Sequence, residues 1–302
     1  MLIPGRFRNL TIRQREARDF YLFILPWLIG FILFTGGPII YSFFISLTNW
    51  TGIRTRDFIG LQNYTELFTI DPLFWTVMKN TVVYGLFSVL LGVMVALALA
   101  LLMNQKVPGI SIFRTIYYLP SVTSGIAIAI MWAWMFNPRA GLVNYIISLF
   151  GITGPGWFAS PQWALPGLII VSLWGVGPNM IILLAGLQGI PQQLYDAARI
   201  DGANRWQEFR NVTLPMLSPV IFYVTVISMI GSFQIFENVL VLTNGGPGTA
   251  TRVLVFDLYQ NAFVNSRMGY ASAQAWILAL LIMFITWLMF RISKRMVNYE
   301  VT

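Results

Sequence analysis

The sequence predicts an all-α integral membrane protein with six transmembrane helices. Of the 302 residues, 57% are hydrophobic and 10% are charged, whereas an average soluble domain is roughly 45–50% apolar. Six charge-free segments reach the ~20 residues that a helix needs to cross a hydrocarbon core. Lys and Arg gather between alternate segments, which is the pattern that marks the cytoplasmic loops of membrane proteins.

The predicted spans are separated by charged and turn-forming residues. In chain order they cover residues 20–46, 80–103, 116–136, 163–188, 214–236 and 271–290. The first span follows a cluster of arginines, as the apolar part of a secretory signal peptide would. However, it lies in a charge-free run of 34 residues, which is too long for such a peptide. We therefore expect a retained membrane helix there.

The stretch before the fourth span leaves an alternative open. Residues 140–195 carry no charge, so a seventh span could lie at their start. Gly151, Gly154, Pro155 and Pro161 interrupt that stretch, and lipid does not tolerate irregular backbone. We favour a short amphipathic helix that lies outside the membrane.

Both ends of the chain are predicted to be cytoplasmic. Thirteen Lys and Arg lie in the N-tail, in residues 104–115, in residues 189–213 and in the C-tail, against six in the other loops. The positive-inside rule then places both tails in the cytoplasm, in agreement with an even number of spans. The predicted organisation is a cytoplasmic N-tail (1–19), a transmembrane domain (20–290) and a cytoplasmic C-tail (291–302).

The composition excludes several functional classes. Without Cys or His the chain cannot form thiolate or imidazole metal sites or a Ser-His-Asp triad. Its net charge of +8 lies between apolar runs rather than in a basic patch, so no nucleic-acid partner is expected. Lys79, Lys106 and Lys294 belong to no Gly-x-x-x-x-Gly-Lys-Ser/Thr sequence, the motif that cradles nucleotide phosphates. We expect no cofactor on this chain and no enzymatic activity.

The segment between spans four and five, residues 189–215, has the most informative pattern. Pro191 suits the first turn of a helix, and Gly202 suits the left-handed residue that ends one. A second helix is expected from about Asn204, leading into span five. Together these two helices form an elbow with Gly202 at the bend.

Small and acidic residues recur in this elbow at a defined spacing: Asp196, Ala197, Ala198, Gly202, Leu214 and Pro215. This set resembles the cytoplasmic "EAA" signature of ABC importer permeases. In that family the elbow is a coupling helix that docks on an ATPase subunit, which the resemblance implies for these six residues. The family pattern begins with Glu, whereas this chain has Asp196, whose carboxylate reaches one methylene less far.

Three further motifs narrow the resemblance. They are Phe58-Ile-Gly-Leu-Gln-Asn-Tyr64, Leu242-Thr-Asn-Gly-Gly-Pro247 and Gly269-Tyr-Ala-Ser-Ala273. Together they are similar to the carbohydrate-uptake permeases of maltose and glycerol-3-phosphate importers, and to the first of the two paired permeases. Gly60 and the Gly-Gly-Pro sequence can equally be loop and turn residues without a docking role.

The resemblance implies a type I ABC importer permease fold in the cell (cytoplasmic or inner) membrane. It also implies a second homologous permease subunit, two ATPase subunits that hold ATP and Mg, and an extracytoplasmic solute-binding protein. The solute would be a sugar or a related polyol or glycerol phosphate, moved by alternating access.

Polar side chains within predicted spans are candidates for the solute path. Ser121, Thr123 and Ser124 can instead bond backbone carbonyls within their own helix. Asn179 follows Gly175, Gly177 and Pro178, which loosen the helix and expose backbone polar groups, so it is a stronger candidate.

Ser232-Phe-Gln-Ile-Phe-Glu237 combines polar groups with aromatic rings, a mixture that binds sugars. In maltose-type permeases the matching stretch lines the solute site, which implies that role for Phe233, Gln234 and Glu237. Glu237 can alternatively pair with an arginine such as Arg252.

A secondary transporter or channel that works without an ATPase is the alternative function. It would need ionisable residues within the spans or an evident selectivity filter. The predicted spans contain no charged residue.

Overall fold

The computed structural model describes residues 11–53 and 56–296 of the chain. Within these ranges the regular structure is helical, and extended pairing is limited to one isolated antiparallel bridge between Thr48 and Phe58. The tails beyond residues 11 and 296, and with them Arg6 and Arg8, lie outside the described residues.

The α-helices follow one another with few long loops. They are α1 Ile12–Phe31, α2 Gly37–Ser46, α3 Gln62–Thr65, α4 Pro72–Met103, α5 Ile110–Tyr118, α6 Gly125–Met135, α7 Leu142–Ser148, α8 Pro161–Ser172, α9 Gly177–Gln188, α10 Gln192–Ile200, α11 Arg205–Glu208, α12 Leu214–Ser232, α13 Glu237–Leu242, α14 Leu254–Tyr259 and α15 Met268–Met296. Several α-helices join through π-helical turns, including Ile32–Gly36 between α1 and α2 and Phe209–Thr213 between α11 and α12.

Four of the described helices are long and apolar enough to cross a membrane. They are Ile12–Ser46, Pro72–Met103, Arg205–Ser232 and Met268–Ser293. Two bent pairs qualify if each is counted as one span: Ile110–Val122 with Gly125–Met135, and Pro161–Gly175 with Gly177–Gln188. The predicted six-span all-α fold is confirmed with each bent pair counted as one span.

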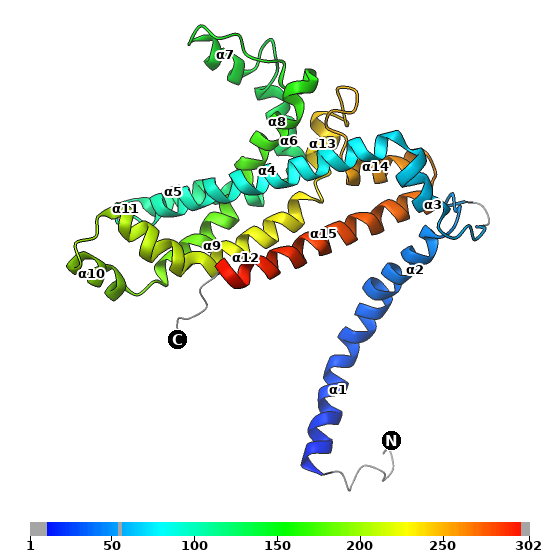
Figure 1. Ribbon diagram of the computed structural model, residues 1–302, viewed down its shortest axis with the longest axis horizontal. Helices are drawn as coiled ribbons and strands as arrows, with labels where there is room; N and C mark the ends of the chain where they lie inside the picture. The colour runs from blue at the N-terminus through cyan, green and yellow to red at the C-terminus, as the bar shows by residue number, and fades with distance from the viewer. Residues whose placement is uncertain (1–10, 54–55, 297–302) are drawn as a thin grey trace, which may run out of the picture.

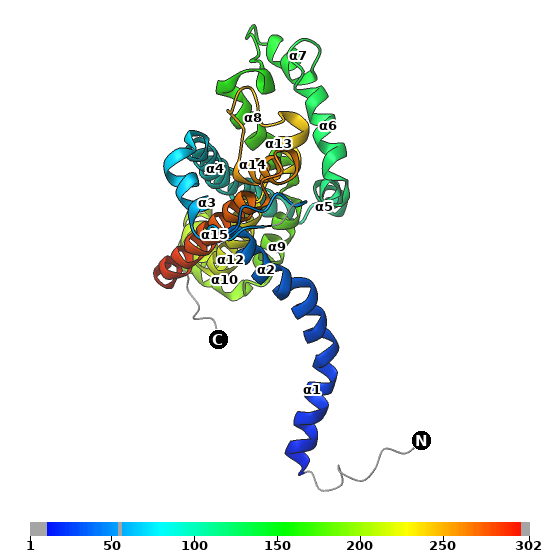
Figure 2. The same ribbon diagram turned by 90° about the vertical axis from the view of Figure 1, so that its right-hand side faces the viewer.

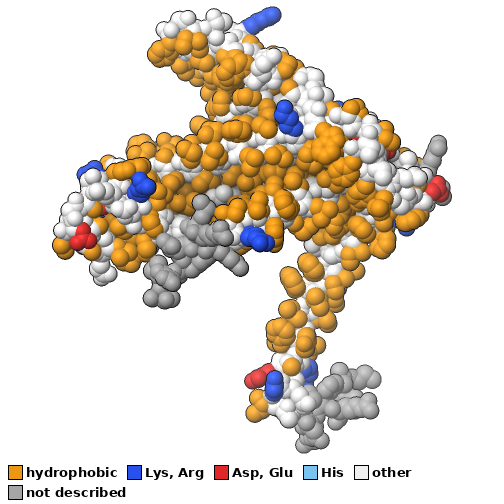
Figure 3. Space-filling model, viewed as in Figure 1, with side chains coloured by type: hydrophobic (Ala, Val, Ile, Leu, Met, Phe, Trp, Pro, Cys, Tyr) orange, Lys and Arg blue, Asp and Glu red, His pale blue; other side chains and the backbone are white. Residues whose placement is uncertain are grey.

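The molecule is a helical bundle with two projecting parts (Figures 1 and 2). Helices α4, α9, α12 and α15 form the bundle, with α10 and α11 at one end and α3 and α14 at the other (Figure 1). The α6–α8 region rises from one side, and α1 extends away from the other. Hydrophobic side chains cover most of the visible face, and charged ones are few (Figure 3).

The bundle has two main hydrophobic clusters. One joins α4, α12, α14 and α15 and includes Phe74, Val77, Phe233, Leu254 and Ala273. The other joins α4, α9 and α12 and includes Ala96, Ala100, Met180, Leu183 and Leu217. In lipid such contacts hold helices by close packing rather than by exclusion of water.

Spans three and four are each bent rather than straight. Span three turns by 103° between Val122 and Gly125, where Thr123 is extended at φ −90° and ψ 146°. Span four bends by 50° at Gly175–Gly177, where the glycines and Pro178 were expected to loosen the helix. Pro120 favours the first interruption because its ring removes a backbone donor. Ser121 and Thr123 bond the carbonyls of Tyr118 and Leu119 at 2.7 and 3.1 Å.

Span five begins earlier and ends earlier than predicted. It runs from Arg205 without a break, through a π-turn before Pro215 in which the Leu214 N–H bonds the Phe209 carbonyl. Further along, Pro219 leaves the Pro215 carbonyl without an amide partner, and the Ser218 hydroxyl donates to that carbonyl at 2.7 Å. The helix then ends at Ser232 rather than at residue 236.

Gly85 of α4 allows Phe233 to pack in the first cluster, because a methyl group on Gly85 would overlap the Phe233 ring. Phe233 is completely buried, so its ring has no room to move away. We expect Gly85→Ala to cost ~1–3 kcal/mol of stability, measured as a lower thermal unfolding midpoint in detergent. Gly231→Ala in α12 is the control, since nothing lies near its added methyl. Equal midpoints for the two variants would contradict this account.

Candidate functional site: a helical elbow and a polar cavity

The predicted elbow is present and its bend lies at Gly202. Helix α10 ends at Ile200, and Gly202 adopts φ +80°, a left-handed conformation that costs other residues energy. The Gly202 and Ala203 amides bond back to the carbonyls of Arg199 and Ala198 at 3.0 and 2.9 Å. The end of α10 is therefore closed by its own backbone, as its sequence predicts.

The second arm starts with a reciprocal cap. The Asn204 side chain accepts from the Gln207 amide at 3.0 Å, and the Gln207 side chain accepts from the Asn204 amide at 2.7 Å. Trp206 and Phe209, three positions apart and hence on one face, then pack together with ring centroids 5.5 Å apart.

Polar contacts fix the two arms relative to each other. Arg199 of α10 bonds Glu208 of α11, Nε to Oε1, at 2.8 Å, and this hydrogen bond raises the pKa of Arg199. The Tyr195 and Thr213 hydroxyls are 3.1 Å apart. Asp196 accepts from Gln192 at 3.1 Å and lies 3.7 Å from Arg199, yet its side chain remains 58% exposed. These contacts hold the two arms together, and the Asp196 carboxylate stays accessible.

Between the arms lies a groove of about 470 Å³. Of the predicted coupling residues, Ala197, Ala198 and Gly202 line it, whereas Asp196 is beside it and Leu214 and Pro215 belong to the start of α12. Ile200, 86% exposed, and Trp206, 66% exposed, flank the bend. The exposure of Ile200 was not foreseen, because an isoleucine near a helix end gives no sequence signal for it.

A second feature is a polar cavity of about 310 Å³ between α4, α8, α9 and α12. Asn179 lines it and donates to the Ser228 hydroxyl at 2.9 Å. Further polar lining residues come from elements distant in sequence: Tyr84, Ser88, Ser172, Ser228 and Ser232. Sequence reasoning missed this set because each is an ordinary polar residue in an apolar helix, and only the packing brings them together.

The interruptions of three spans lie in contact with one another. A methyl group on Gly177, at the break in span four, would overlap the Tyr117 carbonyl just before the break in span three. A methyl group on Gly125, at the other side of that break, would overlap the Glu237 carboxylate. Glu237 begins α13, just beyond the end of span five. Non-helical backbone is thus collected in one region within the protein.

The three path residues predicted at the end of span five, Phe233, Gln234 and Glu237, have different surroundings. Phe233 is completely buried in the apolar cluster, so its ring does not face any cavity, and the structure does not support it as a path residue. Gln234 is exposed and borders a largely apolar groove of about 520 Å³ against α14 and α15. Glu237 is exposed beside Gly125. The alternative pairing of Glu237 with Arg252 is wrong, because Arg252 pairs with Asp257 at 2.6 Å.

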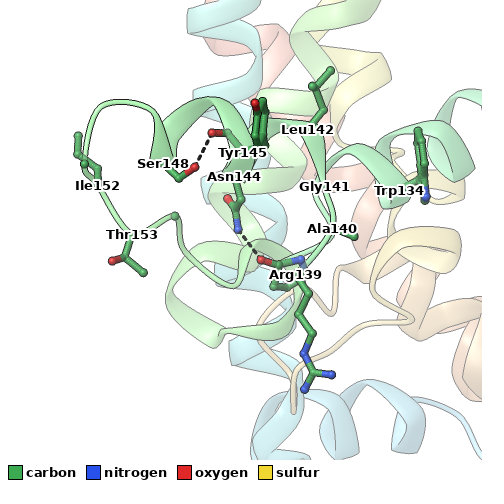
Figure 4. A pocket seen from close by; sticks show the side chains of 13 residues that line it. Trp134, Arg139, Ala140, Gly141, Leu142, Asn144, Tyr145, Ser148, Ile152 and Thr153 are labelled. Atoms are coloured by element: carbon green, nitrogen blue, oxygen red, sulfur yellow. Dashed lines mark hydrogen bonds between the residues drawn. The ribbon is translucent and has the colours of Figure 1, made fainter.

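A larger cavity of about 910 Å³ lies between α6 and α7 (Figure 4). Asn144 of its wall donates to the Pro138 and Pro155 carbonyls at 3.2 and 3.1 Å and accepts from the Trp157 indole at 2.7 Å. The hydrogen-bonding groups of Asn144 are therefore taken up by contacts within the fold. No predicted path residue borders this cavity, and α7, with 7 residues, is too short to be a seventh span.

The Phe58–Tyr64 motif, which lies before α4, has a structural role. The Asn63 amide donates to the Ser46 and Thr48 carbonyls at 2.8 and 2.9 Å, and the Tyr64 and Ser46 hydroxyls are 2.8 Å apart. Gly60 adopts φ +60°. These bonds join the end of α2 to α3, which agrees with a loop role for Gly60.

Up to six apolar spans, a helical elbow and interrupted helices around a polar cavity are the features of a multi-pass membrane protein. Residues 88–298 match the family described as "Binding-protein-dependent transport system inner membrane component". The chain belongs to this family and is a permease of the carbohydrate ABC transporter type, not an enzyme. This membership sets aside the secondary transporter or channel alternative.

Named relatives cover nearly the whole chain. The "Probable ABC transporter permease protein YesP" of Bacillus subtilis (strain 168) is 39% identical over 97% of this chain and 96% of that protein. The "Trehalose/maltose transport system permease protein MalF" of Thermococcus litoralis is 37% identical over 83% and 87% of the two chains. In both cases the sequence similarity extends over most of the chain and is not confined to the elbow.

A solved structure shares the fold. One chain of a bacterial alginate ABC transporter, solved in complex with an alginate pentasaccharide-bound periplasmic protein, superposes with a TM-score of 0.83. It is 26% identical, and the match covers 96% of this chain and 99% of that one. The type I importer permease fold is confirmed. Among the described residues, no group of three or more acidic, Cys or His side chains is placed to hold a metal ion.

Gly202→Ala tests whether the elbow depends on its left-handed residue. The substitution should cost roughly 1–2 kcal/mol locally, so that hydrogen exchange at the Ala203 amide rises about five- to thirtyfold. Exchange would be followed by mass spectrometry of peptides from α10 and α11. Gly189→Ala is the control because Gly189 has φ −79° and an added methyl there would make only ordinary van der Waals contacts, at 3.4 Å or more. If both variants exchange alike, Gly202 is not the constraint.

Proposed function

We propose that the chain is one of two homologous permease subunits of an ATP-driven, binding-protein-dependent importer in the cell inner membrane. The solute is a sugar or a related polyol or glycerol phosphate. Both termini and the elbow face the cytoplasm. The pair of permeases alternates between inward-facing and outward-facing arrangements.

The elbow is the observation that carries this proposal. Its groove is lined by Ala197, Ala198 and Gly202, small residues that permit close approach of another backbone. Ile200 and Trp206 offer exposed apolar surface beside the groove, and Asp196 offers an accessible carboxylate. Such a combination suits a docking ATPase subunit, whose bound ATP and Mg supply the energy.

The first helix supports a second permease subunit. No residue of α1 is buried, and α1 extends away from the bundle (Figure 2). Lipid can cover this apolar helix, but the described residues of the chain bury none of its side chains and so do little to fix its position. A paired subunit would hold it by close packing.

The carbohydrate relatives and the alginate transporter support a sugar solute and a solute-binding protein. The polar cavity around Asn179, with Ser228 and Tyr84, offers neutral hydroxyl and amide groups of the type that bind sugar hydroxyls. Glu237 and Gln234 lie close to the interrupted spans. These residues are our candidates for the solute path.

Ala197→Trp tests the coupling role. Because Ala197 is exposed, the larger side chain fills the groove without disturbing the elbow. The tagged chain would be co-expressed with its paired permease and ATPase subunits and purified in detergent. We expect co-purified ATPase to fall about tenfold or more, equivalent to ~1.4 kcal/mol of binding. Gln193→Trp, exposed on α10 but outside the groove, should retain the ATPase. Retention by both variants, or absence of ATPase from the wild type, contradicts the proposal.

Asn179→Leu tests the solute path. The variant loses the amide and its bond to Ser228, so uptake of trehalose, maltose or arabino-oligosaccharides by reconstituted transporter should fall about three- to tenfold. Co-purification of the ATPase should remain normal. Thr225→Val, which removes only a bond to the Ile221 carbonyl outside the cavity, is the control. Unchanged uptake in the Asn179 variant would remove this cavity from the path.

A further inference from the structure

A buried carboxylate lies at the end of the bundle opposite the elbow. Asp257 of α14 is 1% exposed and was not singled out by the sequence. It accepts from Arg252 Nε at 2.6 Å, from Asn261 at 3.1 Å and from Gln274 of α15 at 2.5 Å. All these donors come from the loop before α14, from the turn after it and from the next span.

The network holds the loop that joins α13 to α14, residues 243–253. The Asn80 amide of α4 donates to the Thr249 and Arg252 carbonyls at 2.9 and 3.1 Å. The Leu254 amide donates to the Thr81 hydroxyl at 2.8 Å. This end of the loop is therefore fastened to both α4 and α15.

The loop is also closed on itself. The Thr251 hydroxyl bonds the Gly246 carbonyl and the Thr243 hydroxyl, both at 2.7 Å. Its tip residues Asn244, Gly248 and Thr249 are exposed. The result is a surface loop with a defined shape, held from beneath by a charge that water does not reach.

Burying a carboxylate costs free energy that apolar packing would not, so such a group is a poor device for stability alone. Its distinct effect is to select one geometry, because three donors in fixed directions are satisfied in one arrangement. The loop that it shapes directly follows α13, whose first residue, Glu237, lies against the interrupted third span.

We propose that Asp257 is a positioning residue that holds the 243–253 loop as a preformed contact for the solute-binding protein. Docking of the binding protein on the loop tip then displaces α13 and the break in span three beside it, and the loop itself keeps its shape. This inference rests on the proposed function, which supplies the binding protein as partner.

Asp257→Asn tests the inference with the intact transporter in liposomes. The substitution keeps the side chain's size and one acceptor oxygen but removes the charge that pairs with Arg252. ATP hydrolysis would be titrated with the cognate solute-binding protein, in the presence of trehalose, maltose and arabino-oligosaccharides. We expect the half-saturating concentration of binding protein to rise about tenfold, with the rate at saturation retained. A purely structural defect would instead lower the amount of active transporter and the rate at saturation.

Glu66→Gln is the matched control, because Glu66 forms an ion pair with Arg267 at 2.6 Å at the same end without touching the loop. Its half-saturation should equal that of the wild type. Arg252→Lys keeps the charge and should restore most of the affinity that Arg252→Gln loses, which provides a test even if Asp257→Asn does not fold. Wild-type half-saturation in both Asp257→Asn and Arg252→Gln overturns the inference, as does an equal rise in Glu66→Gln. A wild type that no binding protein stimulates overturns the proposed function itself.

Discussion

Backbone hydrogen bonding in a medium without water is the constraint on which the whole structure depends. Within lipid, an N–H or C=O without a partner costs several kcal/mol, yet prolines interrupt several of these spans. A local repair is visible in span five, where the Ser218 hydroxyl donates to the Pro215 carbonyl that Pro219 leaves without an amide partner. A π-turn, with the Leu214 amide on the Phe209 carbonyl, leads into Pro215 without breaking the helix. A similar π-turn precedes Pro38 in the first span. Prolines thus remain in continuous helices when a neighbouring group can supply the bond.

Where no repair is made, the helix breaks, and the breaks are packed against protein. Gly177 lies against Tyr117, and Gly125 lies against Glu237, so the glycines are needed for approach rather than for flexibility. Ser121 and Thr123 bond carbonyls at the end of their own helix. The interruptions of spans three, four and five consequently share one site, next to the polar cavity that Asn179 lines. A region of irregular backbone with its own side-chain partners has more than one way to satisfy its hydrogen bonds, which a regular helix does not.

The sequence predicted what local chemistry determines. The left-handed Gly202, the helix that begins directly after Pro191 and the loosening at Gly175 and Pro178 all follow from the conformational limits of glycine and proline. The span count follows from apolar length. The breaks in span three and the burial of Phe233 could not be predicted in this way, because an aromatic residue beside polar ones suits a sugar path and a helix interface equally. The outcome depends on Gly85, nearly 150 positions earlier in the chain, because the absence of a side chain there makes room for the Phe233 ring at the helix interface. Asp257 is a similar case, since its partner Gln274 lies 17 residues away on another helix.

The distribution of polar and apolar contacts indicates where the molecule can change shape. Directional bonds concentrate at the two ends: Arg199 with Glu208 at the elbow, and Asp257 with Arg252 at the opposite end. Between them the helices meet mainly through Leu, Ala, Val and Met side chains, whose contacts have little directional preference. Helices packed in this way can slide or tilt with small changes in energy, whereas a hydrogen-bonded end must break bonds to deform. We therefore expect the elbow end and the Asp257 end each to move as a unit. Movement of one end relative to the other would then occur at the interrupted spans. An ATPase that shifts the elbow and a binding protein that shifts the opposite loop would then act on the same three breaks.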